Sequence, residues 1–309
     1  MPNNAPVQPA QLVNGLPAED FLQKTKDNLH AWDTIADHWE KSQSPEVNGK
    51  NDDGNDMFTQ CLLPVVRELA NWQAGETVLD LGAGSGIIAR LFAKLGAQVT
   101  GLDFSRAMLD IAQKRSVDEG LTDKIVYDFI DLMSTDVMAE YMDKRIQEWG
   151  ADRAKFDIIT ISTTLKSLPS LEPIAAALPT MLKPGGRIVN IDLHPAFSKP
   201  AGHRGMEIYE DPQTGKQQLS TYIKVPKYLN IPPSMSEAVR GQPEPLWIFH
   251  RPFWSLLDPF FRNGLVLDAM REPAFEGEPV LAQAQSYHNF QQTPMLLAFR
   301  LRHAPKSAT

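Results

Sequence analysis

The sequence predicts an α/β fold in which a mostly parallel, seven-stranded sheet carries helices on both faces. Between residues 77 and 193, short runs rich in Val, Ile and Leu alternate with longer stretches of helical periodicity. Strands separated by helices in this way pair in parallel, because each helix carries the chain back across the sheet. The 309 residues are 42% hydrophobic, which is enough to bury one large core.

Local signals bound the individual elements. Ser105 precedes a helical pattern and suits an N-cap, and the KPGG run at 183–186 stops a helix before the fifth strand. We expect the last strand to be antiparallel. The expected strands are 77–81, 98–103, 125–128, 156–162, 188–193, 266–270 and 296–301, and the expected helices of this part are 87–95, 105–119, 134–149, 170–182 and 253–263.

A single domain over residues 19–303 is expected to follow an N-terminal arm, residues 1–18, whose Pro, Asn and Gln content is typical of disorder. Residues 19–72 are expected to form a helical cap of two helices, and Pro64 implies a kink or a late start in the second. Residues 194–251, rich in Pro, Gly and Tyr, form an insertion after the fifth strand on the substrate side.

The composition excludes several classes of protein. The formal net charge of −8 argues against a nucleic-acid partner. Cys61 is the single cysteine and lies in an apolar run, which favours a core residue over a nucleophile, and no metal-ligand spacing occurs. Neither a membrane span nor a signal peptide is evident in the pattern. We therefore expect a soluble, cytoplasmic protein without a metal.

A glycine-rich turn follows the first expected strand. Gly82 and Gly84 permit backbone conformations that other residues avoid and let the chain approach a ligand, while Gly86 lets the next helix start close to the strand. Ligands of open α/β sheets bind at this carboxyl edge. A dinucleotide fingerprint requires Gly or Ala at its sixth position, where this chain has Ile87, so a nicotinamide cofactor is disfavoured.

Together with Asp80, this turn resembles motif I of the class I S-adenosylmethionine (SAM) dependent methyltransferases. The resemblance extends over residues 75–195 and implies a Rossmann-like, seven-stranded class I methyltransferase sheet. It also implies SAM as the cofactor, with S-adenosylhomocysteine as the product. The carboxylate of Asp80 suits the ammonium group of SAM, and Asp103, 23 residues later, can accept both ribose hydroxyls.

The same resemblance assigns further positions around the cofactor. Phe104 and Met108 would flank the adenine, and Asp131, with Asp128 as the alternative, would accept the adenine amino hydrogens. The segment after the fourth strand would run beneath the methionine part. The implied cofactor-binding residues are Asp80, Gly82, Ala83, Gly84, Gly86, Asp103, Phe104, Ser105, Met108, Asp131, Leu132, Ser162 and Thr163.

Two histidines are candidate catalytic bases. A phenol or carbon acid must lose a proton before it accepts a methyl group, and histidine titrates near neutral pH. His194 directly follows the fifth strand and His250 lies in the Phe249–Pro252 segment; a structural imidazole bonded to backbone is the alternative for each. The residues expected to wall the substrate pocket are Trp32, Trp39, Tyr222, Tyr228 and Trp247.

These observations predict methyl transfer from SAM to oxygen or nitrogen of a small molecule, as in secondary metabolism. The alternative is a SAM-binding protein of the same fold that binds a ligand or catalyses a rearrangement. Segments 230–233 and 258–261 resemble the signature of amino-directed nucleic-acid methyltransferases, but neither follows the fourth strand. The acceptor and the oligomeric state stay open.

Overall fold

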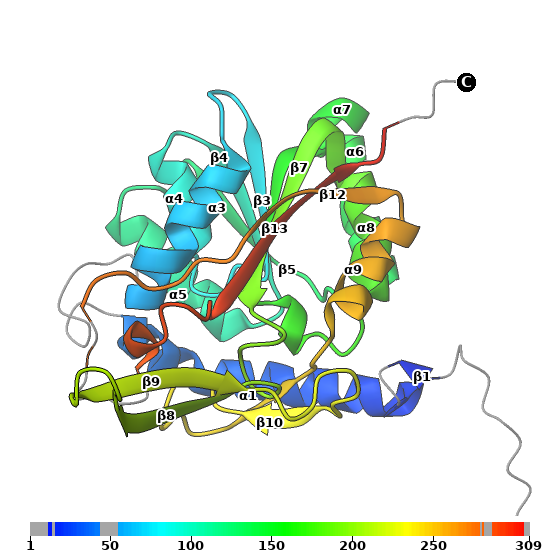
Figure 1. Ribbon diagram of the computed structural model, residues 1–309. Coiled ribbons are helices and arrows are strands. Elements are labelled where there is room, and N and C mark those ends of the chain that lie inside the picture. Colours follow the sequence, from blue (N-terminus) through cyan, green and yellow to red (C-terminus); the bar gives the residue numbers. More distant parts are fainter. Residues whose placement is uncertain (1–11, 14–15, 44–54, 279, 281–285, 306–309) are drawn as a thin grey trace, which may run out of the picture.

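The computed structural model describes residues 12–13, 16–43, 55–278, 280 and 286–305 (Figure 1). Its centre is a seven-stranded sheet in the order β12-β13-β7-β6-β3-β4-β5. The strands from β5 to β7 are parallel, and β13 is antiparallel to both of its neighbours, as the sequence predicted. These strands are β3 (Thr77–Leu81), β4 (Gln98–Asp103), β5 (Ile125–Phe129), β6 (Phe156–Ser162), β7 (Leu182–Leu193), β12 (Leu265–Arg271) and β13 (Leu296–His303).

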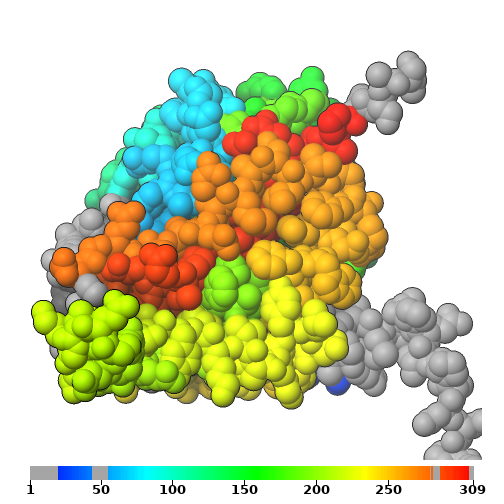
Figure 2. All heavy atoms as spheres, in the orientation of Figure 1, coloured from blue at the N-terminus to red at the C-terminus, as the bar shows by residue number. Residues whose placement is uncertain are grey.

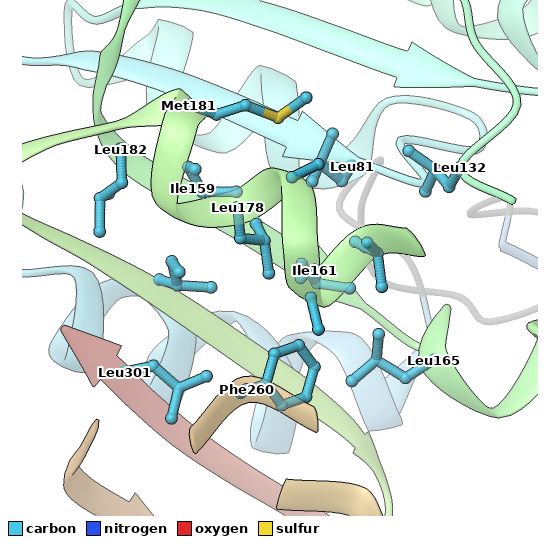
Figure 3. Close-up of a cluster of buried hydrophobic side chains, with 14 of the residues drawn as sticks. Leu81, Leu132, Ile159, Ile161, Leu165, Leu178, Met181, Leu182, Phe260 and Leu301 are labelled. Carbon is cyan, nitrogen blue, oxygen red and sulfur yellow. The ribbon is translucent and has the colours of Figure 1, made fainter. Parts of the chain in front are cut away.

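Helices cover both faces of this sheet. On one face α3 and α4 pack against the strands, and on the other α6, α8 and α9 enclose a second apolar cluster, where Phe260 and Leu178 meet Ile159 and Ile161 (Figure 3). The helical segments of this part are η2 (Met57–Leu62), α3 (Leu63–Ala70), α4 (Ile87–Lys94), α5 (Arg106–Asp118), α6 (Thr135–Trp149), α7 (Ala151–Ala154), η3 (Leu165–Ser167), α8 (Glu172–Met181), α9 (Phe253–Arg262) and η4 (Tyr287–Asn289).

The fifth strand of the prediction is longer than expected. β7 begins at Leu182, which pairs with Phe156, and the next pair joins Arg187 to Ile158. The residues 183–186 therefore form an excursion within one strand, where Gly185 adopts a φ of 79°. The glycines that end the helix also permit this irregularity. The sequence pattern therefore predicted the turn, but it did not predict that Leu182, before the turn, already pairs in the strand.

The helix expected over residues 57–72 consists of two parts. The π-helical η2 comes first, and the regular helix α3 starts at Leu63 with Pro64 in its first turn. Proline is tolerated there because the first-turn N–H groups have no intrahelical partner. Of the two possibilities that Pro64 implied, a kink or a late start of the helix, the late start is correct. Cys61 is a buried residue of η2, and burial raises the pKa of its thiol to about 11, as for an unreactive core residue.

A cap layer lies across the carboxyl ends of the parallel strands. It consists of the long helix α1 (Ala18–Gln43) and of four strands from the insertion, and Figures 1 and 2 show the insertion as a band along this side. These strands form two antiparallel pairs, β8 (His203–Glu210) with β9 (Gln217–Lys224) and β10 (Ser234–Ser236) with β11 (Leu246–Ile248).

The predicted N-terminal arm lies mostly outside the described residues. Within it, β1 (Leu12–Val13) pairs antiparallel with β2 (Leu16–Pro17), and α1 follows directly. In the parts of the chain that the structure describes, no helix combines the length and the apolar character needed to cross a membrane.

Candidate functional site

The glycine turn connects β3 to α4 at the centre of the sheet. Gly82, Gly84 and Gly86 have φ values of 70°, 52° and 78°, in the left-handed region that favours glycine. A Cβ atom on Gly82 would lie 2.2 Å from Oγ1 of Thr164, whereas one on Gly84 would meet nothing within 4 Å. Gly82 is thus required by the protein's own packing, and Gly84 leaves open space beside the turn.

This difference predicts two distinct effects of alanine. Gly82→Ala combines backbone strain with the clash against Thr164, so we expect it to lower the free energy of unfolding by about 3 kcal/mol or more. Gly84→Ala adds strain alone, about 1 to 2 kcal/mol. Chemical denaturation of both variants measures this, and equal losses would contradict the packing argument.

Asp80 is the penultimate residue of β3, is buried, and lines the cavity at the glycine turn. Its Oδ1 accepts a hydrogen bond from Oγ1 of Thr160 at 2.8 Å, while its Oδ2 has no hydrogen-bond partner among the described residues. Burial raises the pKa of this carboxyl group to about 7. A buried carboxylate oxygen without a donor is the place where a cationic ligand group gains most.

Asp103 ends β4 beside the same turn. Its Oδ2 accepts from the N–H of Gly84 and its Oδ1 from the N–H of Ser105, both at 2.8 Å. Burial raises the pKa of Asp103, and these backbone donors oppose the shift. Ser105 caps α5, since its Oγ accepts from the N–H of Met108. One carboxylate therefore holds both the glycine turn and the start of α5.

A cleft of about 930 Å³, its open mouth included, begins at this turn; we call it the donor cavity. It collects most of the predicted cofactor residues and two of the predicted substrate residues. Those in its wall are Trp32, Trp39, Asp80, Gly82, Ala83, Gly84, Asp103, Phe104, Met108, Asp131, Leu132, Ser162 and Thr163. Gly86 and Ser105 lie outside the wall and support it, since a Cβ on Gly86 would lie 2.3 Å from the hydroxyl of Tyr127.

The two candidate aspartates after β5 separate in the structure. Asp131 lines the donor cavity, and its Oδ1 accepts from the N–H of Met133 at 2.8 Å. Asp128 lies within β5, opposite Leu102, and its side chain is exposed away from the cavity wall. The geometry therefore favours Asp131 over Asp128 as an adenine contact.

A second cavity of about 1000 Å³, its open mouth included, adjoins the first beneath the cap; we call it the acceptor cavity. Both walls contain Trp32, Trp39, Thr163 and Ser167, so the two cavities meet at these residues. Thr163 has a φ of 51°, unusual for a branched residue, and its N–H donates to the carbonyl of Ile191. The remaining wall residues are Met57, Lys166, Leu193, Lys199, Arg204, Ser236, Glu237, Ala238, Leu246, Ile248, Tyr287 and Met295.

The predicted catalytic histidines lie outside both cavities. His194 is buried, and its Nδ1 accepts from the N–H groups of Ala196 and Phe197. Its proton therefore lies on Nε2, which faces Oε1 of Glu272 at 3.0 Å, so neither ring nitrogen is a free base. Burial lowers the pKa of this imidazole. His194 lies directly after β7, as expected, but the backbone N–H groups of the following turn already donate hydrogen bonds to its ring.

His250 has a structural partner as well. Its Nε2 donates to the carbonyl of Tyr228 at 2.6 Å, and burial lowers its pKa. Both histidines line a smaller pocket of about 470 Å³ that adjoins the acceptor cavity at Lys166 and Lys199. A base role for either histidine stays a prediction that this geometry does not favour.

Three of the predicted substrate aromatics are also placed elsewhere. Tyr222 lies across the β8–β9 hairpin, where its hydroxyl donates to Glu207. The hydroxyl of Tyr228 accepts from the N–H of Phe253, and the indole N–H of Trp247 donates to Asp27. These side chains hold the cap together and do not line the donor or acceptor cavity.

Asn28, which is not evident as a site residue from the sequence, joins three parts of the site. Its Nδ2 donates to the carbonyls of Ser167 and Trp247 at 3.0 Å each, and its Oδ1 accepts from the N–H of Trp247 at 2.7 Å. A buried Asn in an amphipathic helix was the available signal. Asp33, also missed, accepts from Oγ of Ser105 and so binds α1 to α5. Thr25 and Lys166 were likewise not foreseen as wall residues.

In the described residues, no group of three or more His, Cys, Asp or Glu side chains could hold a metal ion. The polar groups in the wall of the donor cavity include the carboxylates of Asp80, Asp103 and Asp131, the turn amides and the hydroxyls of Ser162 and Thr163. This set suits an organic ligand with hydroxyl and amino groups.

Comparison with known proteins shows what the region around this site is similar to. Residues 79–190 match the family described as Methyltransferase domain. The chain is 36% identical over 126 residues to the ubiquinone biosynthesis O-methyltransferase of Pasteurella multocida (strain Pm70), covering 41% of this chain and 50% of that protein. The corresponding enzyme of Paraburkholderia phytofirmans is 35% identical over 113 residues, which cover 37% of this chain and 42% of that protein. The chain thus spans about half the length of the curated relatives it matches.

Solved structures share the fold at lower identity. A SAM-dependent methyltransferase from Mesorhizobium loti superposes with a TM-score of 0.54 at 23% identity, covering 78% of this chain and 96% of that one. The CcbJ methyltransferase from Streptomyces caelestis gives 0.54 at 17% identity, covering 89% and 98%. Residues 79–190 therefore match a methyltransferase domain, and the sheet order and the glycine turn agree with the fold of these solved structures.

Proposed function

We propose that this chain transfers a methyl group from SAM to oxygen or nitrogen of a small molecule that binds beneath the cap. The observation that supports it best is the junction of the two cavities at Thr163, Ser167, Trp32 and Trp39. A donor in the first cavity and an acceptor in the second would meet there, which is the arrangement that an in-line transfer requires.

The residues of the donor cavity fit SAM. The partnerless Oδ2 of Asp80 matches its ammonium, and Asp103 retains lone pairs for the ribose hydroxyls beyond its two backbone donors. Phe104 and Met108 offer apolar surface for the adenine, and Asp131 an acceptor for its amino group. The open space beside Gly84 lets the ligand approach the backbone.

The methyl group of SAM is already activated by its sulfonium, so this chain supplies position and a dry environment. The cap excludes water above the junction, and Trp32 and Trp39, whose ring centroids are 5.4 Å apart, form an apolar wall against both cavities. The acceptor's lone pair then attacks the methyl carbon while the carbon–sulfur bond breaks, the electron pair of that bond stays on sulfur, and the proton of the methylated oxygen or nitrogen passes to solvent. We place this activity in the cytoplasm.

Incubation with methyl-labelled SAM and a metabolite extract, followed by mass spectrometry, tests the transfer. We expect a product that has gained one labelled methyl group and that disappears in Asp103→Ala. Calorimetry with SAM, S-adenosylhomocysteine and NAD accompanies it. Binding of SAM without any methylated product would favour the alternative of binding or rearrangement, and tight binding of NAD alone would refute both.

A further inference from the structure

The acceptor cavity has a charge opposite to that of the chain. The chain carries 38 acidic and 30 basic residues, yet the cavity wall contains the three cations Lys166, Lys199 and Arg204 and the single acid Glu237. Glu237 is exposed, and its Oε2 accepts from the N–H of Gly241. The other wall residues are aromatic, aliphatic or hydroxyl-bearing, so the charged groups give the cavity wall a net positive charge.

Lys166 is the cation closest in sequence to the junction of the two cavities. It lies on η3, three residues after Thr163, and its half-buried side chain lines the acceptor cavity. Among the described residues its ammonium has no hydrogen bond or ion pair. Asp192 is near, but its two oxygens accept from the backbone N–H groups of Lys166 and Leu193.

Desolvation makes this unpaired ammonium costly. Burial lowers the pKa of Lys166, and Asp192 opposes the shift. An anion in the acceptor cavity would restore a full charge–charge contact in a region of low dielectric constant. The buried cation Arg251, also near Asp192, does not need an anionic ligand, because its guanidinium donates to the carbonyls of Leu165, Leu168 and Pro169.

The rest of the wall indicates the shape of the ligand. Trp32 and Trp39 face the cavity from α1, and Tyr287 does so with the guanidinium of Arg204 4.0 Å from its ring centroid. Lys199 is exposed at the cavity wall and shares the smaller pocket with Lys166. Flat apolar surfaces bordered by two lysines suit a planar hydrophobic molecule with an anionic end.

We propose that the acceptor belongs to the class of small aromatic or apolar acids, and that its anionic group lies against Lys166 and Lys199. This inference rests on the proposed function, because it assigns the second cavity to the acceptor. The inference limits the possible acceptor molecules to those that carry a negative charge at neutral pH.

The test compares two probes of equal shape, 2-naphthoate and 2-naphthamide, on the full chain saturated with S-adenosylhomocysteine. Tryptophan fluorescence reports binding next to Trp32 and Trp39. We expect the acid to bind at least about tenfold more tightly than the amide. Lys166→Met and Lys199→Met should each remove most of this preference while leaving amide binding within about twofold. Lys216→Met, at an exposed lysine of the insertion, is the matched control and should leave the preference unchanged.

The outcomes separate the two proposals. Absence of S-adenosylhomocysteine binding in calorimetry, measured before the probes are added, would refute the proposed function and the inference with it. Normal binding of S-adenosylhomocysteine, together with equal affinity for acid and amide or no binding of either, would refute the inference alone. A preference that survives both lysine substitutions would also overturn it, and unchanged S-adenosylhomocysteine affinity in those variants shows that they fold.

Discussion

Asp80→Asn is expected to weaken SAM binding by at least about a hundredfold at pH 7.5, because a buried, charge-assisted hydrogen bond to the ligand's ammonium is lost. The Asn side chain retains the shape and can still accept from Thr160, so the change removes charge with little repacking. Calorimetric titration with SAM measures the loss. Asp128→Asn, at an exposed position of β5, serves as the control and should bind SAM normally.

The same carboxyl group predicts how SAM binding depends on pH. Burial raises the pKa of Asp80 to about 7 in the ligand-free protein, so the group is protonated below that pH. The ligand's ammonium requires the carboxylate, and SAM affinity should therefore fall about tenfold for each pH unit below 7. In Asp80→Asn this dependence should be absent. A wild-type affinity that is constant from pH 5.5 to 7.5 would contradict this role of Asp80.

Asp80→Asn should have the opposite effect on the ligand-free protein. The unfolded chain ionises this group near 3.8, whereas the folded chain does so near 7. Between these values the unfolded state releases the proton first, so the contribution of Asp80 to stability falls as pH rises through that window. The Asn variant escapes this loss, and its free energy of unfolding should exceed the wild-type value more at pH 7.5 than at pH 5.

Asn28→Ala is expected to open the cap. The substitution leaves one N–H and two carbonyls of the packed cap without their partner, at a cost of about 2 to 4 kcal/mol. Amide hydrogen exchange should accelerate in α1 and β11 while β3, β4 and β6 stay protected. Asn28→Asp keeps the acceptor for the N–H of Trp247 but cannot donate to the two carbonyls. Its acceleration of exchange in α1 and β11 should therefore be at least intermediate between wild type and Asn28→Ala.

Thr34→Ala is the matched control on the same helix, because its Oγ1 donates only within α1, to the carbonyl of His30. Exchange in the cap should be nearly unchanged in this variant. Equal acceleration in Asn28→Ala and Thr34→Ala would show that α1 is held by its apolar face alone and that the Asn28 contacts contribute nothing specific.

The sheet and the donor side of the site could be predicted because short, continuous segments of the sequence determine them. β3, β4 and β6 have the predicted bounds, since a buried parallel strand is a continuous apolar run that ends where polar ligand contacts begin. The residues around Gly82 and Asp103 follow these strands directly, so placing the strands also placed the residues. Asp128 and Asp131 could be separated only when the end of β5 was known.

The acceptor side could not be predicted to the same depth. Tyr222 and Tyr228 were assigned by residue type, and type does not tell which face of the insertion a ring covers. His194 was placed correctly after β7, but the N–H groups of Ala196 and Phe197 occupy its ring. Lys166 lacked any pattern of its own, because its significance depends on a cavity wall assembled from distant segments.

The hydrogen bonds of Asn28 also fix an order of assembly. They close loops of 139 and 219 residues, the latter almost the full span from α1 to the insertion. Contacts of such separation form only after the intervening sheet has brought their ends together, and they are the first to be lost on local opening. The acceptor cavity should therefore be the last part of this protein to form during folding, after the donor cavity is complete.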